Sequence, residues 1–227
     1  MPLTDQNNLL PEAISSKLSH FKRIAQEADT LTAAAVVICI LPGTETEPAC
    51  ILLTRRSSKL RNHPGQYALP GGKVDAGENI IDAAVRELEE ELNLPQSHSR
   101  VLGQLDDIET QSGFNISPVV ILSEAASNLR PNPDEVAAVY RIPLVELETI
   151  TLDISYEDDT PIDPNTRKII KGNKPENSRS VMSMHIPSVG TSIYSPTAAI
   201  IYQFIEVGLR GLETRVAHFG QPRFAWQ

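Results

Sequence analysis

The 227-residue chain predicts a mixed α/β (α+β) fold with additional helices near both ends. Three observations predict it. Short β-rich runs alternate with segments of helical periodicity. The composition, 41% hydrophobic and 22% charged, is that of an ordinary globular protein. No internal repeat and no clean linker divides the chain, so we expect one domain over residues 1–227.

The first third combines a helix with neighbouring strands. Apolar residues at helical spacing predict an amphipathic helix over about residues 12–28. Two β-rich runs, at 33–41 and 50–56, then predict a hairpin or adjacent strands joined by a long loop. The stretch at 61–79 is dense in Gly and Pro, which predicts a loop with a short strand at 67–69.

The clearest helix spans residues 79–92, because apolar residues recur there on one stripe at about 100° per residue. Asn93 and Pro95 are expected to end it. The runs VLGQLDDIET and FNISPVVIL predict further strands. The run NPDEVAAVYRIPLVEL begins as a turn, continues as a strand and ends in a short helix near 143–149.

The last third begins with a polar segment at about 153–180, which we expect to be a long loop or insertion because it contains little apolar content. The run SPTAAIIYQFIEVGLRGL predicts a final helix. Ser195 is its expected N-cap and Pro196 its first helical residue.

Charge and composition narrow the partners and the compartment. The net charge of −9 argues against a nucleic-acid partner. No targeting segment is visible, and the longest apolar run, AAAVVICIL, is shorter than the ~20 residues that cross a bilayer. We therefore expect no membrane partner and a cytoplasmic location. Cys39 and Cys50 lack metal-site spacing and lie in apolar runs, so we expect buried free thiols.

The acidic stretch RELEEELN begins at Arg86, the only Arg or Lys between Val74 and Ser99. Glu87, Glu90 and Glu91 share one face of the predicted helix. Two carboxylates 4 Å apart repel by ~1 kcal/mol in water and by ~4 kcal/mol at an effective dielectric of 20. The cluster is therefore tolerable on a solvated face, whereas in a cleft it needs a counterion. Carboxylate oxygens suit Mg²⁺ or Mn²⁺.

The residues around this stretch resemble the Nudix box of the Nudix hydrolases, over residues 72–94. The matching residues, at the family's spacing, are Gly72, Glu78, Arg86, Glu87, Leu88, Glu90, Glu91 and Leu94. The resemblance implies the Nudix fold, a mixed β-sheet sandwiched between helices. Asn93 stands where the family usually has Gly, and Asn is the next most tolerant residue for a left-handed helix end.

The resemblance also implies roles for the charged residues of the box. Glu87, Glu91 and Glu90 are the expected ligands of Mg²⁺ or Mn²⁺. Arg86 is expected to pair with Glu78 and so to orient the ligands, as groups behind a metal site do. The alternative for Arg86 is an ordinary intrahelical ion pair with Glu90.

Two further expectations concern the loops. Gly71 and Gly72 would let the backbone pass close to metal and phosphate. Glu135 in NPDEV is a candidate general base or further metal ligand, and Glu90 is the competing base. The alternative for Glu135 is an exposed or turn-capping acid. The loop histidines His63 and His98 receive no role.

The segment LLTRRSSKLRNHPGQYALPGG (52–72) resembles the signature of the coenzyme A pyrophosphatase branch of the family. Arg56 and Arg61 carry that signature and are the expected phosphate-binding residues, because arginine clamps phosphate bidentately. Leu69 replaces the usual aromatic residue. The alternative is a basic loop that only balances the acidic helix, and Arg55 and Lys59 fit this description better.

The implied activity is metal-dependent hydrolysis of the diphosphate of coenzyme A or acyl-coenzyme A, giving 3′,5′-ADP and (acyl-)4′-phosphopantetheine. The alternatives are the same chemistry on ADP-ribose, NADH or a dinucleoside polyphosphate, and a non-catalytic Nudix-fold binding or regulatory protein. The expected partner is a small-molecule nucleotide of the coenzyme A type. A homodimer is possible.

Overall fold

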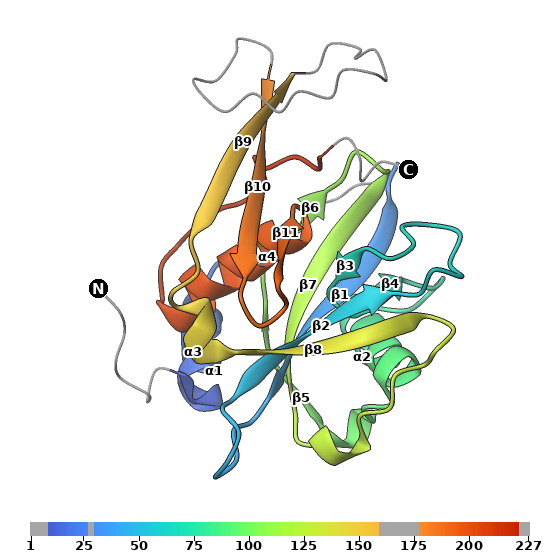
Figure 1. Ribbon diagram of the computed structural model, residues 1–227, viewed down its shortest axis with the longest axis vertical. Coiled ribbons are helices and arrows are strands. Elements are labelled where there is room, and N and C mark those ends of the chain that lie inside the picture. The colour runs from blue at the N-terminus through green and yellow to red at the C-terminus, as the bar shows by residue number, and fades with distance from the viewer. Residues whose placement is uncertain (1–8, 27–29, 159–177, 223–227) are drawn as a thin grey trace.

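A computed structural model describes residues 9–26, 30–158 and 178–222. Figure 1 shows two β-sheets, with helices on both sides of the larger one. The helices are α1 (Pro11–His20), α2 (Ile80–Leu92), α3 (Leu144–Leu147) and α4 (Thr197–Phe204), the last continued by a π-helical turn at Ile205–Leu209. The strands are β1 (Thr32–Leu41), β2 (Cys50–Arg56), β3 (Tyr67–Ala68), β4 (Gly71–Lys73), β5 (Ser99–Gln104), β6 (Ile108–Glu109), β7 (Phe114–Ser123), β8 (Val136–Pro143), β9 (Leu152–Asp158), β10 (Ser178–Ile186) and β11 (Thr191–Tyr194).

Strand β1 is the centre of the larger sheet. It pairs in parallel with β7 along one edge, while β2 and β4 pair with the other edge in the antiparallel sense. Strand β2 pairs with β1 near Ile40, and β4 pairs with it near Ala35. Strand β1 thus changes partner along that edge. Between β2 and β4 the chain forms a loop and then the short strand β3, which pairs with β2. The sheet is mixed, as predicted.

Side chains of β1 alternate between two cores, as the twofold periodicity of a strand requires. Val37 and Cys39 lie in the core that packs against α2. Ile38 and Ile40 lie in the other core, which includes residues of α1, α4 and β10. The sheet therefore lies between helices, which confirms the predicted sandwich. Cys39 and Cys50 are buried free thiols, also as predicted.

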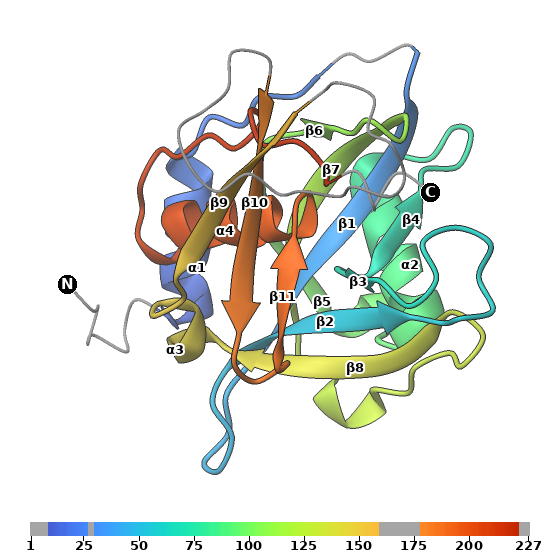
Figure 2. The same cartoon turned by 45° about the horizontal axis from the view of Figure 1, so that its top comes forward.

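The smaller sheet corrects one expectation. The polar segment 153–180 was expected to be loop, but its two ends belong to β9 and β10, which pair in the antiparallel sense. The burial of Met182 and Met184 beyond the polar segment anchors β10, so strand pairing extends into residues whose own composition is polar. Residues 159–177 lie outside the described residues. Strands β10 and β11 pack on α4, as both views show (Figures 1 and 2).

The two terminal helices exist, but their predicted limits were wrong. Helix α1 ends at His20, and Phe21 is already extended, with φ −74° and ψ 120°. The backbone N–H of Ile24 donates to Asp106 (2.8 Å), so a tertiary contact replaces further helix. Helix α4 begins at Thr197 without a side-chain cap. Ser195 is not its N-cap, because the Ser195 hydroxyl bonds to the backbone of Met182.

None of the described helices has the length and apolar character needed to cross a membrane.

Candidate active site

Helix α2 is capped at both ends by asparagine. The Asn79 side chain accepts a hydrogen bond from the backbone N–H of Asp82 (2.9 Å). Asn93 adopts the left-handed conformation, with φ 57° and ψ 34°. The one departure from the expected box is therefore compatible with the helix end, as predicted. The Asn93 side chain also donates to the Asn128 carbonyl (3.0 Å) and ties that end to the following loop.

Arg86 joins three carboxylates. Its Nε and Nη2 donate to the two oxygens of Glu78, at 2.9 and 3.0 Å. Its Nη1 donates to Glu87 (2.8 Å) and to Glu90 (3.1 Å). The predicted Arg86–Glu78 pair and its intrahelical alternative with Glu90 therefore coexist. Arg86 also donates to the Lys73 carbonyl (3.0 Å), so one side chain fixes the loop before the helix to the acidic face.

Gly71 and Gly72 bring the backbone of β4 against this acidic face. A Cβ on Gly72 would lie 2.4 Å from Oε1 of Glu87, so only glycine leaves that carboxylate its place. Gly71 has φ +147°, and a Cβ there would lie 2.2 Å from the Ala35 carbonyl oxygen. The Gly71 N–H points to Oε2 of Glu91, at 3.4 Å.

Burial makes these carboxylates difficult to ionise. Glu91 is only 5% exposed. Its burial raises the pKa of its carboxyl to about 8, and the Glu87 charge adds to the increase, while Arg56 and the Gly71 N–H oppose it. Burial also raises the pKa of Glu87, against the opposing hydrogen bond from Arg86. Two neighbouring buried acids with raised pKa values are stabilised as anions by a cation.

This donor set fits a hard divalent cation, since carboxylate oxygens are its usual ligands. Among the described residues, however, no group of three or more His, Cys, Asp or Glu side chains is already arranged to hold an ion. Arg86 explains part of this arrangement, because it binds Glu87 and Glu90 through hydrogen bonds. Glu87 and Glu91 would form the core of the site, with Glu90 beside them. Arg86 holds Glu87 and Glu90 through one oxygen each, which leaves the other oxygen of each carboxylate for a cation.

Glu135 lies near the same cluster although it is distant in sequence. Its charge contributes to the raised pKa values of both Glu87 and Glu91. The fold places it there because Val136 at the start of β8 pairs with Arg56 of β2. The Ser57 N–H also donates to the Glu135 carbonyl (2.8 Å). Glu89 is exposed, and so is Glu90, whose side chain is held by Arg86.

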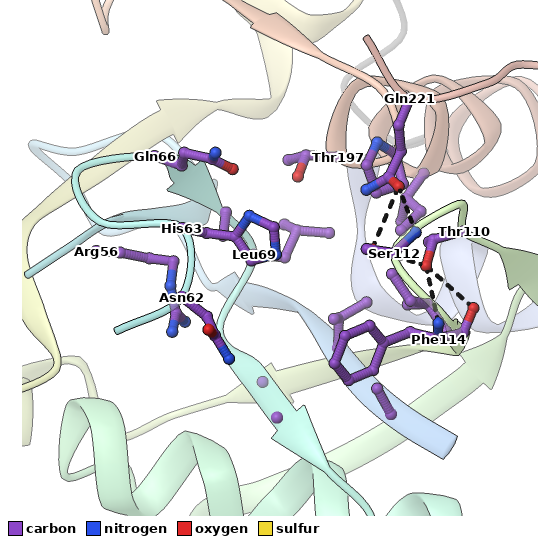
Figure 3. A pocket seen from close by; sticks show the side chains of 18 of the residues that line it. Arg56, Asn62, His63, Gln66, Leu69, Thr110, Ser112, Phe114, Thr197 and Gln221 are labelled. Atoms are coloured by element: carbon purple, nitrogen blue, oxygen red, sulfur yellow. Dashed lines mark hydrogen bonds between the residues drawn. The ribbon is translucent and has the colours of Figure 1, made fainter. Parts of the chain in front are cut away.

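A cleft of about 260 Å³ opens beside the glycine pair. Figure 3 shows Arg56, Asn62 and His63 on one side, with Thr110, Ser112, Phe114 and Gln221 across from them. Leu69, Ile116 and Ile200 also line it. The cleft thus combines an apolar surface with Arg56 and the glycine pair. The Glu87 and Glu91 carboxylates lie against those glycines and are not themselves part of its lining.

The basic residues of the loop separate by position. Arg56 lines the cleft, and its charge acts on Glu91. Arg61 is exposed and is not among the cleft-lining residues. Lys59 forms an exposed ion pair with Asp134 (2.7 Å). Lys59 thus pairs within the molecule, but with an acid before β8 and not with the acidic helix that the alternative named.

Sequence reasoning missed several residues of the cleft, above all His63, Phe114 and Gln221. His63 lies inside the arginine-rich segment, so its position was a usable signal. No signal in the sequence marks Gln221, because only tertiary packing brings it to the Thr110–Phe114 turn. Its side-chain oxygen accepts from the backbone N–H of Ser112 (3.2 Å).

Comparison with known proteins agrees with the box. The sequence model of the family described as NUDIX domain matches residues 31–165 of this chain. A protein of Pectobacterium atrosepticum, "Uncharacterized Nudix hydrolase NudL", is 43% identical over 120 residues, which are 52% of this chain and 60% of that protein. A protein of the same name from Yersinia enterocolitica is 46% identical over 114 residues, 50% of this chain and 57% of that protein.

The chain spans about three fifths of the length of these curated relatives. A solved structure, the MutT NUDIX hydrolase from Burkholderia pseudomallei, is 30% identical in sequence to this chain. The matched region takes in 50% of this chain and 83% of that protein, with a TM-score of 0.38. The family assignment rests on the domain model, whose match takes in β1 to β9 and the whole of the acidic helix. The chain therefore belongs to the NUDIX family.

Proposed function

We propose that this chain is a Mg²⁺- or Mn²⁺-dependent pyrophosphohydrolase that cleaves the diphosphate of coenzyme A or its acyl derivatives. The carrying observation is that Arg56, from the arginine signature, lines one cleft with Gly71 and Gly72, while the Glu87 and Glu91 carboxylates lie against those two glycines. The signature and the box are separate in sequence. Their meeting supports a site that binds a phosphate chain next to a metal.

The residues of the site have different proposed roles, according to where each lies. Glu87 and Glu91, with Glu90, would hold the cation, which when bound supplies neutralising charge to the diphosphate. Arg86 holds Glu87 and Glu90 and links them to the Glu78 loop. Arg56 would bind phosphate oxygens from the cleft wall.

The reaction would be the attack of a water oxygen on one phosphorus of the anhydride. The bond from that phosphorus to the bridging oxygen breaks, and the second phosphate leaves with that oxygen. Glu135 is our candidate to accept the proton from water, since its charge already acts on both Glu87 and Glu91. Glu90 is the other candidate, although its hydrogen bond to Arg86 restrains it.

The cleft also suits the organic part of such a substrate. Leu69 and Phe114 give it an apolar surface, while Asn62, Gln66 and Gln221 add amide groups at its sides. Leu69 is 4% exposed, so the residue that replaces an aromatic ring serves packing more than stacking. Arg61 is exposed and does not line the cleft, although the next residue, Asn62, does. We propose that Arg61 contacts the 3′-phosphate of the substrate.

The test is turnover of coenzyme A and acetyl-coenzyme A with Mg²⁺ or Mn²⁺, with the products identified by mass spectrometry. We expect 3′,5′-ADP and a phosphopantetheine product, and loss of turnover in Glu91→Gln. Absence of cleavage with both metals, or an undiminished Glu91→Gln rate, would reject the proposal.

A substrate panel separates the alternatives within the family, because specificity is the ratio of kcat/KM values. Higher kcat/KM for ADP-ribose, NADH or a dinucleoside polyphosphate would reassign the substrate. Equal cleavage of dephospho-coenzyme A would remove the inferred 3′-phosphate contact. Tight binding of the substrates without turnover would indicate a binding protein instead.

A further inference from the structure

His63 lies in the loop between β2 and β3 with an unusual backbone. Its φ is +54°, in the left-handed region that costs an ordinary residue ~1–2 kcal/mol. The loop holds it there through hydrogen bonds from the Arg56 N–H to the Gln66 carbonyl (2.9 Å) and from the Gly65 N–H to the Arg56 carbonyl (3.2 Å). Such strain persists where the surrounding structure imposes it, and it clusters at functional sites.

The His63 side chain carries a second unusual feature. Its Nδ1 is shielded from solvent and has no hydrogen-bond partner among the described residues. The Nε of Arg56 is in the same condition. Both side chains line the cleft, and in Figure 3 they lie next to each other on one side of it. Neither nitrogen has accessible surface in this conformation, so a bound group satisfies them once the two side chains turn toward the cleft that they line.

The chemistry of the pair indicates which group fits. Burial, and then the Arg56 charge, lower the pKa of His63, so its ring is neutral near pH 7 and offers one N–H donor. Arg56 offers only donors. A neutral donor beside a guanidinium suits an anionic oxygen. The Arg56 charge also acts on Glu91, which places the pair at the end of the cleft nearest the carboxylates.

We propose that His63 and Arg56 together bind a non-bridging oxygen of the substrate's diphosphate, which makes His63 a substrate-binding residue. This inference rests on the proposed function for the identity of its ligand. Its structural basis, two unpartnered nitrogens on side chains that line the cleft, is independent of the carboxylates.

Three variants separate the ring from the backbone. His63→Ala removes the donor and keeps the backbone strain. His63→Gly removes the donor and relieves the strain. His63→Asn tolerates the left-handed conformation and retains an N–H donor. His185→Ala, at an exposed position of β10, is the matched control.

The readouts are KM for coenzyme A, the affinity for ADP by calorimetry, and the ring ¹⁵N signals of histidine. We expect both His63→Ala and His63→Gly to raise KM and weaken ADP binding by about 10-fold or more, the loss of one hydrogen bond to a charged group. His63→Asn should recover part of the loss, and His185→Ala should behave as wild type. ADP should shift the His63 ring signals in the wild-type protein.

The outcomes keep the two proposals apart. Wild-type KM and ADP affinity in both His63→Ala and His63→Gly would overturn the role of His63, whatever the substrate. The wild-type protein could cleave nothing in the panel while ADP still shifts the His63 signals and the variants weaken ADP binding. In that case the proposed hydrolysis fails, but the binding of a phosphate oxygen by His63 and Arg56 stands.

Discussion

Gly71 and Gly72 are neighbours, but the structure requires glycine at each for a different reason. At Gly72 the obstacle is the Glu87 carboxylate, a side chain that can be displaced. At Gly71 it is the backbone of Ala35 and Val36, which cannot move without opening the sheet. The same alanine substitution should therefore damage function at one position and folding at the other.

We expect Gly72→Ala to fold with a melting temperature close to wild type, because the clash falls on a side chain. Turnover and metal affinity should fall at least 10-fold, the usual effect of disturbing a ligand's setting. Gly71→Ala should instead lower the melting temperature by several degrees. Thermal melts and metal titrations on both variants check this. Normal metal affinity in Gly72→Ala would mean that Glu87 is not a ligand.

The buried Glu91 carboxyl predicts an unusual pH dependence for the metal-free protein. Burial raises its pKa from the usual 4.5 to about 8 in the folded state. Between these values the unfolded chain releases a proton that the folded protein keeps. The free energy of unfolding should therefore fall as pH rises from about 5 to 8, by at most ~1.4 kcal/mol per pH unit.

Urea denaturation in EDTA at several pH values measures this slope, and Glu91→Gln is the control that lacks the titrating group. We expect the variant to be the more stable protein at pH 8 and to show a shallower slope. Mg²⁺ should stabilise the wild-type protein more at pH 8 than at pH 5. A wild-type slope that matches Glu91→Gln would contradict the raised pKa.

At the scale of elements, the end of α2 depends on Asn93. Both Asn93→Ala and Asn93→Gly lose the side-chain bond to the Asn128 carbonyl. Only alanine adds the cost of the left-handed backbone, ~1–2 kcal/mol. We therefore expect Asn93→Gly to be more stable than Asn93→Ala by about 1 kcal/mol in denaturant unfolding. Equal stabilities would show that the helix end rearranges instead of retaining its left-handed residue.

What the sequence predicted was local. Helix α2 follows from the periodicity of its apolar residues, and its end follows from Asn93, a residue type that tolerates the left-handed conformation. The Arg86–Glu78 pair follows from the spacing of the motif. The limits of α1 could not be predicted, because Ile24 continues the helical pattern while its backbone bonds to Asp106. The ends of β9 and β10 were missed because polar composition concealed strand pairing.

The candidate site shows the same division. Glu87, Glu90 and Glu91 share one face of α2, so sequence spacing was enough to group them. Gln221 joins the cleft only through contacts more than a hundred residues away in sequence, as its bond to Ser112 shows. No local pattern encodes such a contact. His63 was visible, but nothing in the sequence announced its backbone conformation or its unpartnered nitrogen.

At the scale of the whole molecule, a buried acidic pair joins segments far apart in the chain. Asp106 and Asp107, between β5 and β6, are 2% and 3% exposed. Asp107 binds Arg23 beyond α1 (2.6 Å), and Asp106 binds Arg215 in the C-terminal segment (2.7 Å). Gln203 of α4 also donates to Asp106 (2.7 Å). These contacts connect both terminal segments to the larger sheet.

Arg215→Met tests this connection, because methionine keeps an apolar chain near Phe21 but removes the charge that Asp106 faces. A buried carboxylate left without its cation should cost about 3 kcal/mol. Lys59→Met is the matched control, since it breaks an ion pair whose partners are 67% and 77% exposed and should cost less than ~1 kcal/mol. Urea midpoints of the two variants measure the difference. If both lie within 1 kcal/mol of wild type, the acidic pair does not hold the C-terminal segment in place, because Gln203 and the Ile24 N–H then suffice to satisfy Asp106.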